Sequence, residues 1–245
     1  MRPAALLLLA AALAPCAPAR GHEGHGAASA GKPAAGRPAA GRPAAPAAEV
    51  PSTSAFPIPA PGSYRLPPIR PAAGGAVLDE TGRRLDLLGG ALRGRVSVLA
   101  LIYTRCGDVC PLANADMARL QDLAARDPGL AGRMRLVTLS FDPEHDTPEV
   151  MRAFAATWRS PDPAAPAWSF LTAPDRAALA PVLAAYDQRV DARPDSAGGG
   201  LSHLFRAFLI DRDGRIRNIY SLDFFDPALV LTDVRTLLIE ETRGR

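Results

Sequence analysis

The stretch that decides the fold is the apolar run Val96-Ser97-Val98-Leu99-Ala100-Leu101-Ile102-Tyr103, which continues as Thr104-Arg105-Cys106-Gly107-Asp108-Val109-Cys110-Pro111. A short, nearly continuous apolar run is typical of a strand that is buried on both faces of a sheet. The run stops at polar residues, and Pro111 suits the first turn of a helix. The stretch therefore predicts a buried strand that leads directly into a helix, as in an α/β domain.

Apolar periodicity and turn residues predict the remaining elements on both sides of this stretch. Strands are expected at residues 76–79, 84–87, 136–141, 168–171, 206–211 and 215–220, and helices at about 111–126, 148–158, 175–186 and 227–240. Asp146 or Thr147 should cap the second helix, and Pro181 should interrupt or kink the third. Two strand–helix–strand units followed by a hairpin predict a three-layer α/β domain with a mixed central sheet.

The first part of the chain has a different composition. Of the 25 prolines among 245 residues, 14 lie within the first 71 positions, and a Gly-Lys/Arg-Pro-Ala-Ala repeat occupies residues 31–45. Such a segment has too few apolar side chains to form a core and favours extended polyproline II structure. We therefore expect a disordered Ala/Pro/Gly-rich tether at residues 20–70 and a folded domain at residues 71–245.

Residues 1–19 have the features of a secretory signal peptide. Arg2 precedes the apolar residues 4–14, and Ala17-Pro18-Ala19 fits a cleavage site. The apolar run is short for a membrane-spanning helix, so cleavage is expected, with lipidation at Cys16 as an alternative. The expected location is the periplasm or the outer face of the cytoplasmic membrane, with membrane association only through an uncleaved or lipidated N-terminus.

The charge distribution argues against nucleic-acid binding. The net charge of the whole chain is +3, but residues 1–70 carry seven basic and two acidic side chains, which leaves residues 71–245 with a net charge of −2. A domain without a basic excess has little to neutralise phosphates. No apolar run of about 18 residues occurs, so a multi-spanning membrane protein is also excluded.

The chemistry is expected at Cys106 and Cys110, which lie where the buried strand meets the helix. The i, i+4 spacing brings both sulfurs to one side of a helical turn, and a helix N-terminus favours the thiolate form. The pair could form a structural disulfide or bind a soft metal, Cu(I) above all, with zinc also acceptable. His145 and His203 could add an imidazole. His203 precedes an apolar strand that could lie beside residues 96–103.

Three stretches together resemble the SCO/SenC family of copper chaperones. They are residues 103–111, the segment Ser140-Phe141-Asp142-Pro143-Glu144-His145-Asp146-Thr147-Pro148-Glu149, and His203 ahead of Leu209-Ile210-Asp211-Arg212-Asp213-Gly214. The resemblance covers residues 71–241 and implies a thioredoxin-like fold. It also implies that copper, as Cu(I) or Cu(II), binds to Cys106, Cys110 and His203.

The same resemblance implies a function in assembly of the CuA centre of cytochrome c oxidase, whose CuA subunit, or another copper or thiol protein, would be the partner. The expected role is a metallochaperone without substrate turnover. The alternative is a thiol–disulfide oxidoreductase that uses Cys106 and Cys110 as a redox pair. The sequence leaves both interpretations open.

Two further expectations concern segments rich in small residues. Residues 192–200, which end in three glycines, should let His203 approach the cysteines. If the signal is cut after Ala19, the mature chain begins Arg20-Gly21-His22, a geometry that can bind Cu(II), with His25 nearby. The alternative for His22 and His25 is an ordinary linker.

Overall fold

The computed structural model describes residues 56–107, 110–192 and 200–243. The predicted signal peptide, Cys16, His22, His25 and most of the predicted tether lie outside the described residues. Within the described part of the chain, no helix combines the length and the apolar character that a membrane crossing requires.

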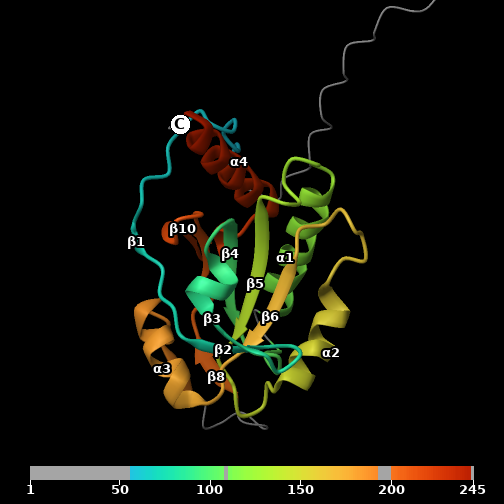
Figure 1. The fold of residues 1–245 in the computed structure, drawn as a ribbon, viewed down its shortest axis with the longest axis vertical. Helices are drawn as coiled ribbons and strands as arrows, with labels where there is room; N and C mark the ends of the chain where they lie inside the picture. The colour runs from blue at the N-terminus through green and yellow to red at the C-terminus, as the bar shows by residue number, and fades with distance from the viewer. Residues whose placement is uncertain (1–55, 108–109, 193–199, 244–245) are drawn as a thin grey trace, which may run out of the picture. The chain divides into compact units, whose positions relative to one another are not determined.

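An eight-stranded mixed sheet forms the middle of the domain, with the strand order β1-β10-β9-β4-β5-β6-β2-β3 (Figure 1). The strands are β1 (Arg70–Pro71), β2 (Ala76–Asp79), β3 (Arg84–Asp86), β4 (Val96–Ile102), β5 (Met134–Ser140), β6 (Trp168–Thr172), β9 (Ala207–Ile210) and β10 (Arg215–Tyr220). Strands β4, β5 and β6 are parallel, and the other neighbours are antiparallel. The predicted mixed sheet is confirmed.

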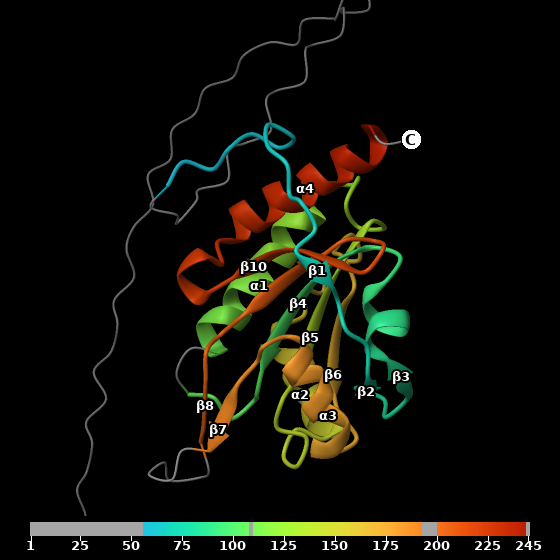
Figure 2. The same cartoon turned by 90° about the vertical axis from the view of Figure 1, so that its left-hand side faces the viewer.

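Helices lie on both faces of this sheet. They are α1 (Cys110–Ala125), α2 (Pro148–Trp158), α3 (Arg176–Ala185) and α4 (Pro227–Arg243), with the short helical turns η1 (Leu87–Leu92) and η2 (Leu222–Phe224). Helices α1 and α4 pack against each other on one face, and η1 lies on the opposite face (Figure 2). The three-layer α/β architecture is therefore as predicted.

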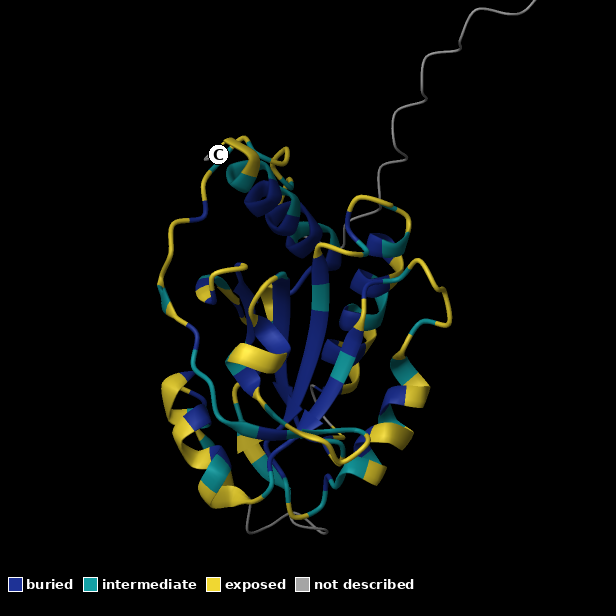
Figure 3. Ribbon diagram, viewed as in Figure 1, coloured by how far each residue is buried: buried dark blue, intermediate teal, exposed yellow. Residues whose placement is uncertain are grey.

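All seven residues of strand β4 are buried (Figure 3). Its register explains why: Leu99 lies opposite Val137 of β5 on one side and opposite Phe208 of β9 on the other. A strand with neighbours on both sides and helical layers on both faces consists mostly of apolar side chains. The hydroxyl of its polar residue, Ser97, donates to the Leu92 carbonyl at 2.7 Å. The run that is visible in the sequence is the direct result of this position.

The sheet topology brings three connecting segments to one edge. Strands β4 and β5 are parallel, so both end at the same edge of the sheet. Strand β9 is antiparallel to β4, so it begins at that edge. The segments that follow β4, follow β5 and precede β9 therefore meet there. These segments contain Cys106, Asp146 and His203, respectively.

Some elements differ from those expected. The additional strands β1, β7 (Val190–Ala192) and β8 (Leu201–His203) contain only two or three residues each, too few to show an alternating pattern. Helix α3 is not interrupted, although Pro181 lies inside it. Asp175 caps its start by accepting a hydrogen bond from the Ala178 amide at 2.7 Å, and the buried Leu179 and Val182 hold it against the domain.

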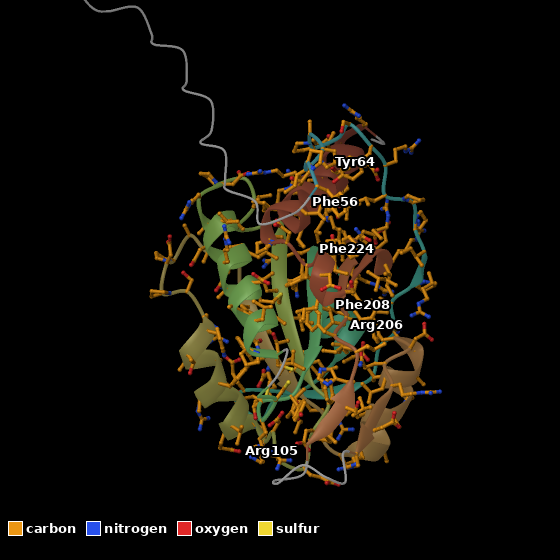
Figure 4. All side chains as sticks on the ribbon, turned by 180° about the vertical axis from the view of Figure 1, so that it is seen from behind. Phe56, Tyr64, Arg105, Arg206, Phe208 and Phe224 are labelled. Carbon is orange, nitrogen blue, oxygen red and sulfur yellow. The ribbon has the colours of Figure 1, made fainter. Side chains whose placement is uncertain are left out.

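The folded part starts before residue 71, which corrects the predicted boundary. The amide of Gly62 donates to Thr236 of α4 at 3.0 Å, and the Tyr64 hydroxyl donates to Asp233 of the same helix. Leu66 is buried. Figure 4 shows Tyr64 and Phe56 on the side of the domain where α4 lies. We call residues 56–70 the N-terminal strap. Their proline content suggested a tether, whereas Tyr64 is hydrogen-bonded to α4 and the Leu66 side chain belongs to the buried core.

Leu66→Ala should lower the free energy of unfolding by about 2 kcal/mol, because it removes a buried leucine side chain from the strap. Urea unfolding of the full chain measures this difference. Ile69→Ala is the matched control, since Ile69 lies in the same strap but is 54% exposed, and it should change stability little. Equal, small effects of both substitutions would show that the strap does not pack against the domain in solution.

Candidate metal centre

Cys106 and Cys110 lie in the turn that connects β4 to α1. Cys110 is the first residue of α1, and its amide N–H donates to the Cys106 Sγ at 3.4 Å. The amide of Cys106 in turn donates to the Tyr103 carbonyl at 3.3 Å. Both cysteines are thiols and both are buried. The helix start therefore places the two sulfurs together, as the i, i+4 spacing predicted.

His203 is the last residue of β8, which forms a two-stranded hairpin with β7. Its Nε2 lies 3.7 Å from the Cys110 Sγ. The two sulfurs and one imidazole nitrogen all lie within 4.8 Å of one another. The strand that follows His203 pairs with β4, as expected. The structure thus brings together Cys106, Cys110 and His203, the three residues to which the sequence pointed.

Aromatic side chains surround the His203 imidazole. The Tyr103 ring meets it edge-on with a centroid separation of 5.7 Å, and the Phe141 ring lies 4.8 Å away. Tyr103 and Phe141 also contact each other, at 5.3 Å. These rings restrict the orientation of the imidazole and shield it from water on their side. No sequence pattern singled out Tyr103 or Phe141 as part of the site.

The donor set suits a soft metal ion. Two thiol sulfurs and one imidazole nitrogen favour Cu(I), whereas a structural zinc site usually needs four protein ligands. The three residues are close enough to bind one ion after a small adjustment of side chains. The shielded position of both cysteines would also limit access of water to a bound ion.

Asp142, His145 and Asp146 form a second group of polar side chains within 4.8 Å of one another. Asp146 is fully buried, and its carboxylate accepts hydrogen bonds from the Thr104 amide at 2.9 Å and from the hydroxyls of Thr104 and Ser140. His145 is partly exposed, and its Nδ1 lies 2.9 Å from the same carboxylate. The Asp146 oxygens are thus occupied by protein donors, and the group supports the fold.

This network holds the segment that precedes Cys106. Asp146 binds Thr104, and Asp142 accepts a hydrogen bond from Arg105 at 2.7 Å. The hydrogen bond to Asp142 raises the pKa of Arg105 above its ordinary value, so the guanidinium stays charged. Thr147, not Asp146, caps α2. The sequence signal for this anchoring role was the pair Asp142 and Asp146, which lie four residues apart directly after the strand β5.

Comparisons with known proteins identify the family of this chain. The sequence profile of the SCO1/SenC family matches residues 77–238. The chain belongs to this family. A SCO1 protein homolog from Bacillus subtilis is 26% identical over 132 residues, which are 54% of this chain and 64% of that relative. The chain therefore matches somewhat less than two thirds of the length of this curated relative.

Solved structures of the family share the fold. Bradyrhizobium japonicum ScoI with copper bound has a TM-score of 0.56 and 24% identity, with 68% of this chain and 98% of that chain covered. BsSco, described as a member of the Sco family of cytochrome c oxidase assembly proteins with a disulfide switch, has a TM-score of 0.56 and 22% identity over 71% of this chain and 96% of its own. The predicted thioredoxin-like fold is confirmed.

Asp146→Asn should lower the free energy of unfolding by about 2–3 kcal/mol, because an amide of the same shape presents N–H donors to the Thr104 and Ser140 donors. Thermal or urea unfolding measures the change. Glu144→Gln is the control on the same loop, since Glu144 is exposed in an ion pair with Arg176 and should leave stability unchanged. A stable Asp146→Asn protein would contradict the anchoring role of this carboxylate.

Proposed function

We propose that this domain binds one copper ion through the sulfurs of Cys106 and Cys110 and an imidazole nitrogen of His203. The observation that carries the proposal is the convergence of these three ligand atoms from two separate segments. The donor chemistry supports Cu(I) in the reduced protein. The copper that is bound in the related ScoI structure points in the same direction.

The redox state of the two cysteines should control this binding. Their i, i+4 spacing and the separation of the two sulfurs, which lie within 4.8 Å of each other, allow a disulfide to form after rotation of the side chains. Formation of the disulfide removes both thiol protons and two electrons, which an external oxidant such as a disulfide must accept. The oxidised pair can no longer act as two thiolate ligands, so oxidation should release the metal.

In the cell, we propose a metallochaperone role outside the cytoplasm, in assembly of the CuA centre of cytochrome c oxidase. The signal-like residues 1–19 support export. Membership of the SCO1/SenC family, which includes proteins described as cytochrome c oxidase assembly proteins, supports the pathway. The partner would then be the CuA subunit or another copper or thiol protein. Attachment to the membrane would require an uncleaved or lipidated N-terminus.

Thiol–disulfide exchange with a partner is the second candidate function, because the two thiols lie at one helix start. Two observations make copper binding the better-supported function. The cysteines are only 6% and 2% exposed, whereas an attacking thiol needs access to its substrate. In addition, an imidazole lies 3.7 Å from the Cys110 sulfur, and a dithiol exchange mechanism does not require that ligand.

The reduced protein should retain one Cu(I) per chain after dialysis, as measured by metal analysis. Cys106→Ser and Cys110→Ser should each abolish retention, because one sulfur ligand is lost. His203→Ala should weaken binding and remove the nitrogen ligand from the Cu(II) spectrum. His145→Gln is the matched control, since His145 belongs to the Asp146 network and should leave retention unchanged.

Oxidation to the disulfide should abolish copper retention in the same assay. Equal retention by the oxidised protein, or by either serine variant, would contradict the proposed site. Turnover of a dithiol or disulfide substrate by a protein that retains no copper would support the oxidoreductase instead.

A further inference from the structure

Tyr103 is buried and lies directly between β4 and the cysteine turn. Its hydroxyl lies 3.2 Å from the amide nitrogen of Leu201 and 3.2 Å from the carbonyl oxygen of the same residue. A tyrosine hydroxyl can donate one hydrogen bond and accept others, so it can accept from the amide N–H and donate to the carbonyl. One side chain thus satisfies both peptide groups of Leu201.

This pairing is significant because of where Leu201 lies. It is the first residue of β8, and His203 is the last residue of the same three-residue strand. A backbone that is held at Leu201 fixes the position of His203, because two residues of extended chain span only about 7 Å and have little freedom once one end is held. The hydroxyl therefore determines where the imidazole can lie.

Tyr103 contacts the cysteine turn as well as the hairpin. Its carbonyl accepts the hydrogen bond from the Cys106 amide at 3.3 Å. Its ring meets the His203 imidazole edge-on at 5.7 Å. β4 is held in the middle of the sheet, and Tyr103 directly follows it. The contacts of Tyr103 therefore fix the segments that carry Cys106 and His203 relative to β4.

Two further contacts of the hairpin lie away from the cysteines. The β7–β8 pairing joins the hairpin to itself, with Val190 opposite His203. Gln188 donates to the Leu204 carbonyl at 3.0 Å, which ties the end of the hairpin to the segment after α3. Neither contact fixes the hairpin relative to the cysteines.

We propose that the Tyr103 hydroxyl is a positioning group that holds the β7–β8 hairpin in the geometry in which His203 can bind the same ion as Cys106 and Cys110. The proposal rests on the proposed copper site. It adds that His203 is already held near the cysteines before the metal binds. A larger fraction of the molecules is then competent to bind copper, and the apparent copper affinity is higher. Because the role depends on the hydroxyl oxygen alone, a substitution that keeps the ring can test it separately from ring packing.

Tyr103→Phe in the full-length reduced chain removes that oxygen and keeps the aromatic ring. Both peptide groups of Leu201 then lose a buried partner, which favours an open hairpin. We expect the dissociation constant for Cu(I) to rise about tenfold, as when the binding-competent fraction falls about tenfold. The Leu201 amide should also exchange with deuterium faster, and the nitrogen coupling in the electron paramagnetic resonance spectrum of the Cu(II) form should become weaker or heterogeneous.

Tyr186→Phe is the matched control. The Tyr186 ring is fully buried, and its hydroxyl donates to the Ala73 carbonyl at 3.0 Å, a hydrogen bond between a tyrosine and the backbone that does not involve the hairpin. Its removal should affect overall stability without changing copper affinity, Leu201 exchange or nitrogen coupling. A general loss of stability would therefore not imitate the expected result.

The outcomes separate this proposal from the one on which it rests. In one outcome, His203→Ala loses copper affinity while Tyr103→Phe keeps the wild-type affinity, Leu201 exchange and nitrogen coupling. That result would overturn the role of the hydroxyl and leave the copper site intact. Equal copper binding by wild type and His203→Ala would overturn the copper site itself. The same weakening in Tyr103→Phe and Tyr186→Phe would show a stability effect and would also overturn the positioning role.

Discussion

The position of β4 is the constraint on which the rest of the structure depends. Both of its faces are covered, and it has a neighbouring strand on each side. A strand that pairs with a parallel neighbour on one side and an antiparallel neighbour on the other cannot shift by one residue without exchanging the side chains that pack against its two helical layers. Its carboxyl end is therefore fixed in space. Because β5 ends and β9 begins at the same end of the sheet, three segments must meet there. They are the segment after β4 with Cys106, the segment after β5 with Asp146, and the β7–β8 hairpin with His203.

Asp142 and Asp146, which follow β5, fix the segment that leads from β4 to Cys106. Asp146 is fully buried and accepts hydrogen bonds from Thr104 and Ser140, while Asp142 binds Arg105. A buried carboxylate is costly without partners, and here the donors lie just ahead of the first cysteine. The interactions that make the carboxylates tolerable are therefore the same ones that position the thiols. Tyr103 completes the arrangement on the histidine side.

Features encoded by local pattern could be predicted from the sequence. The apolar run identified β4, Pro111 marked the start of α1, and the apolar residues after His203 identified β9 as a neighbour of β4. Features that depend on tertiary contacts could not. The strap looked like a tether because its anchors, such as Tyr64 on Asp233, lie more than 160 residues apart in the chain. The inward direction of Asp146 and the Tyr103 hydroxyl likewise depend on which segments meet after folding.

The central claim is that one copper ion binds to two cysteine sulfurs and one histidine nitrogen that the sheet topology brings together. X-ray absorption spectroscopy at the copper edge, on the reduced full-length protein loaded with one equivalent of Cu(I), tests it most directly. The account predicts two sulfur scatterers and one nitrogen scatterer per copper, with the nitrogen lost in His203→Ala. A spectrum with only nitrogen and oxygen neighbours, or one that His203→Ala leaves unchanged, would contradict it.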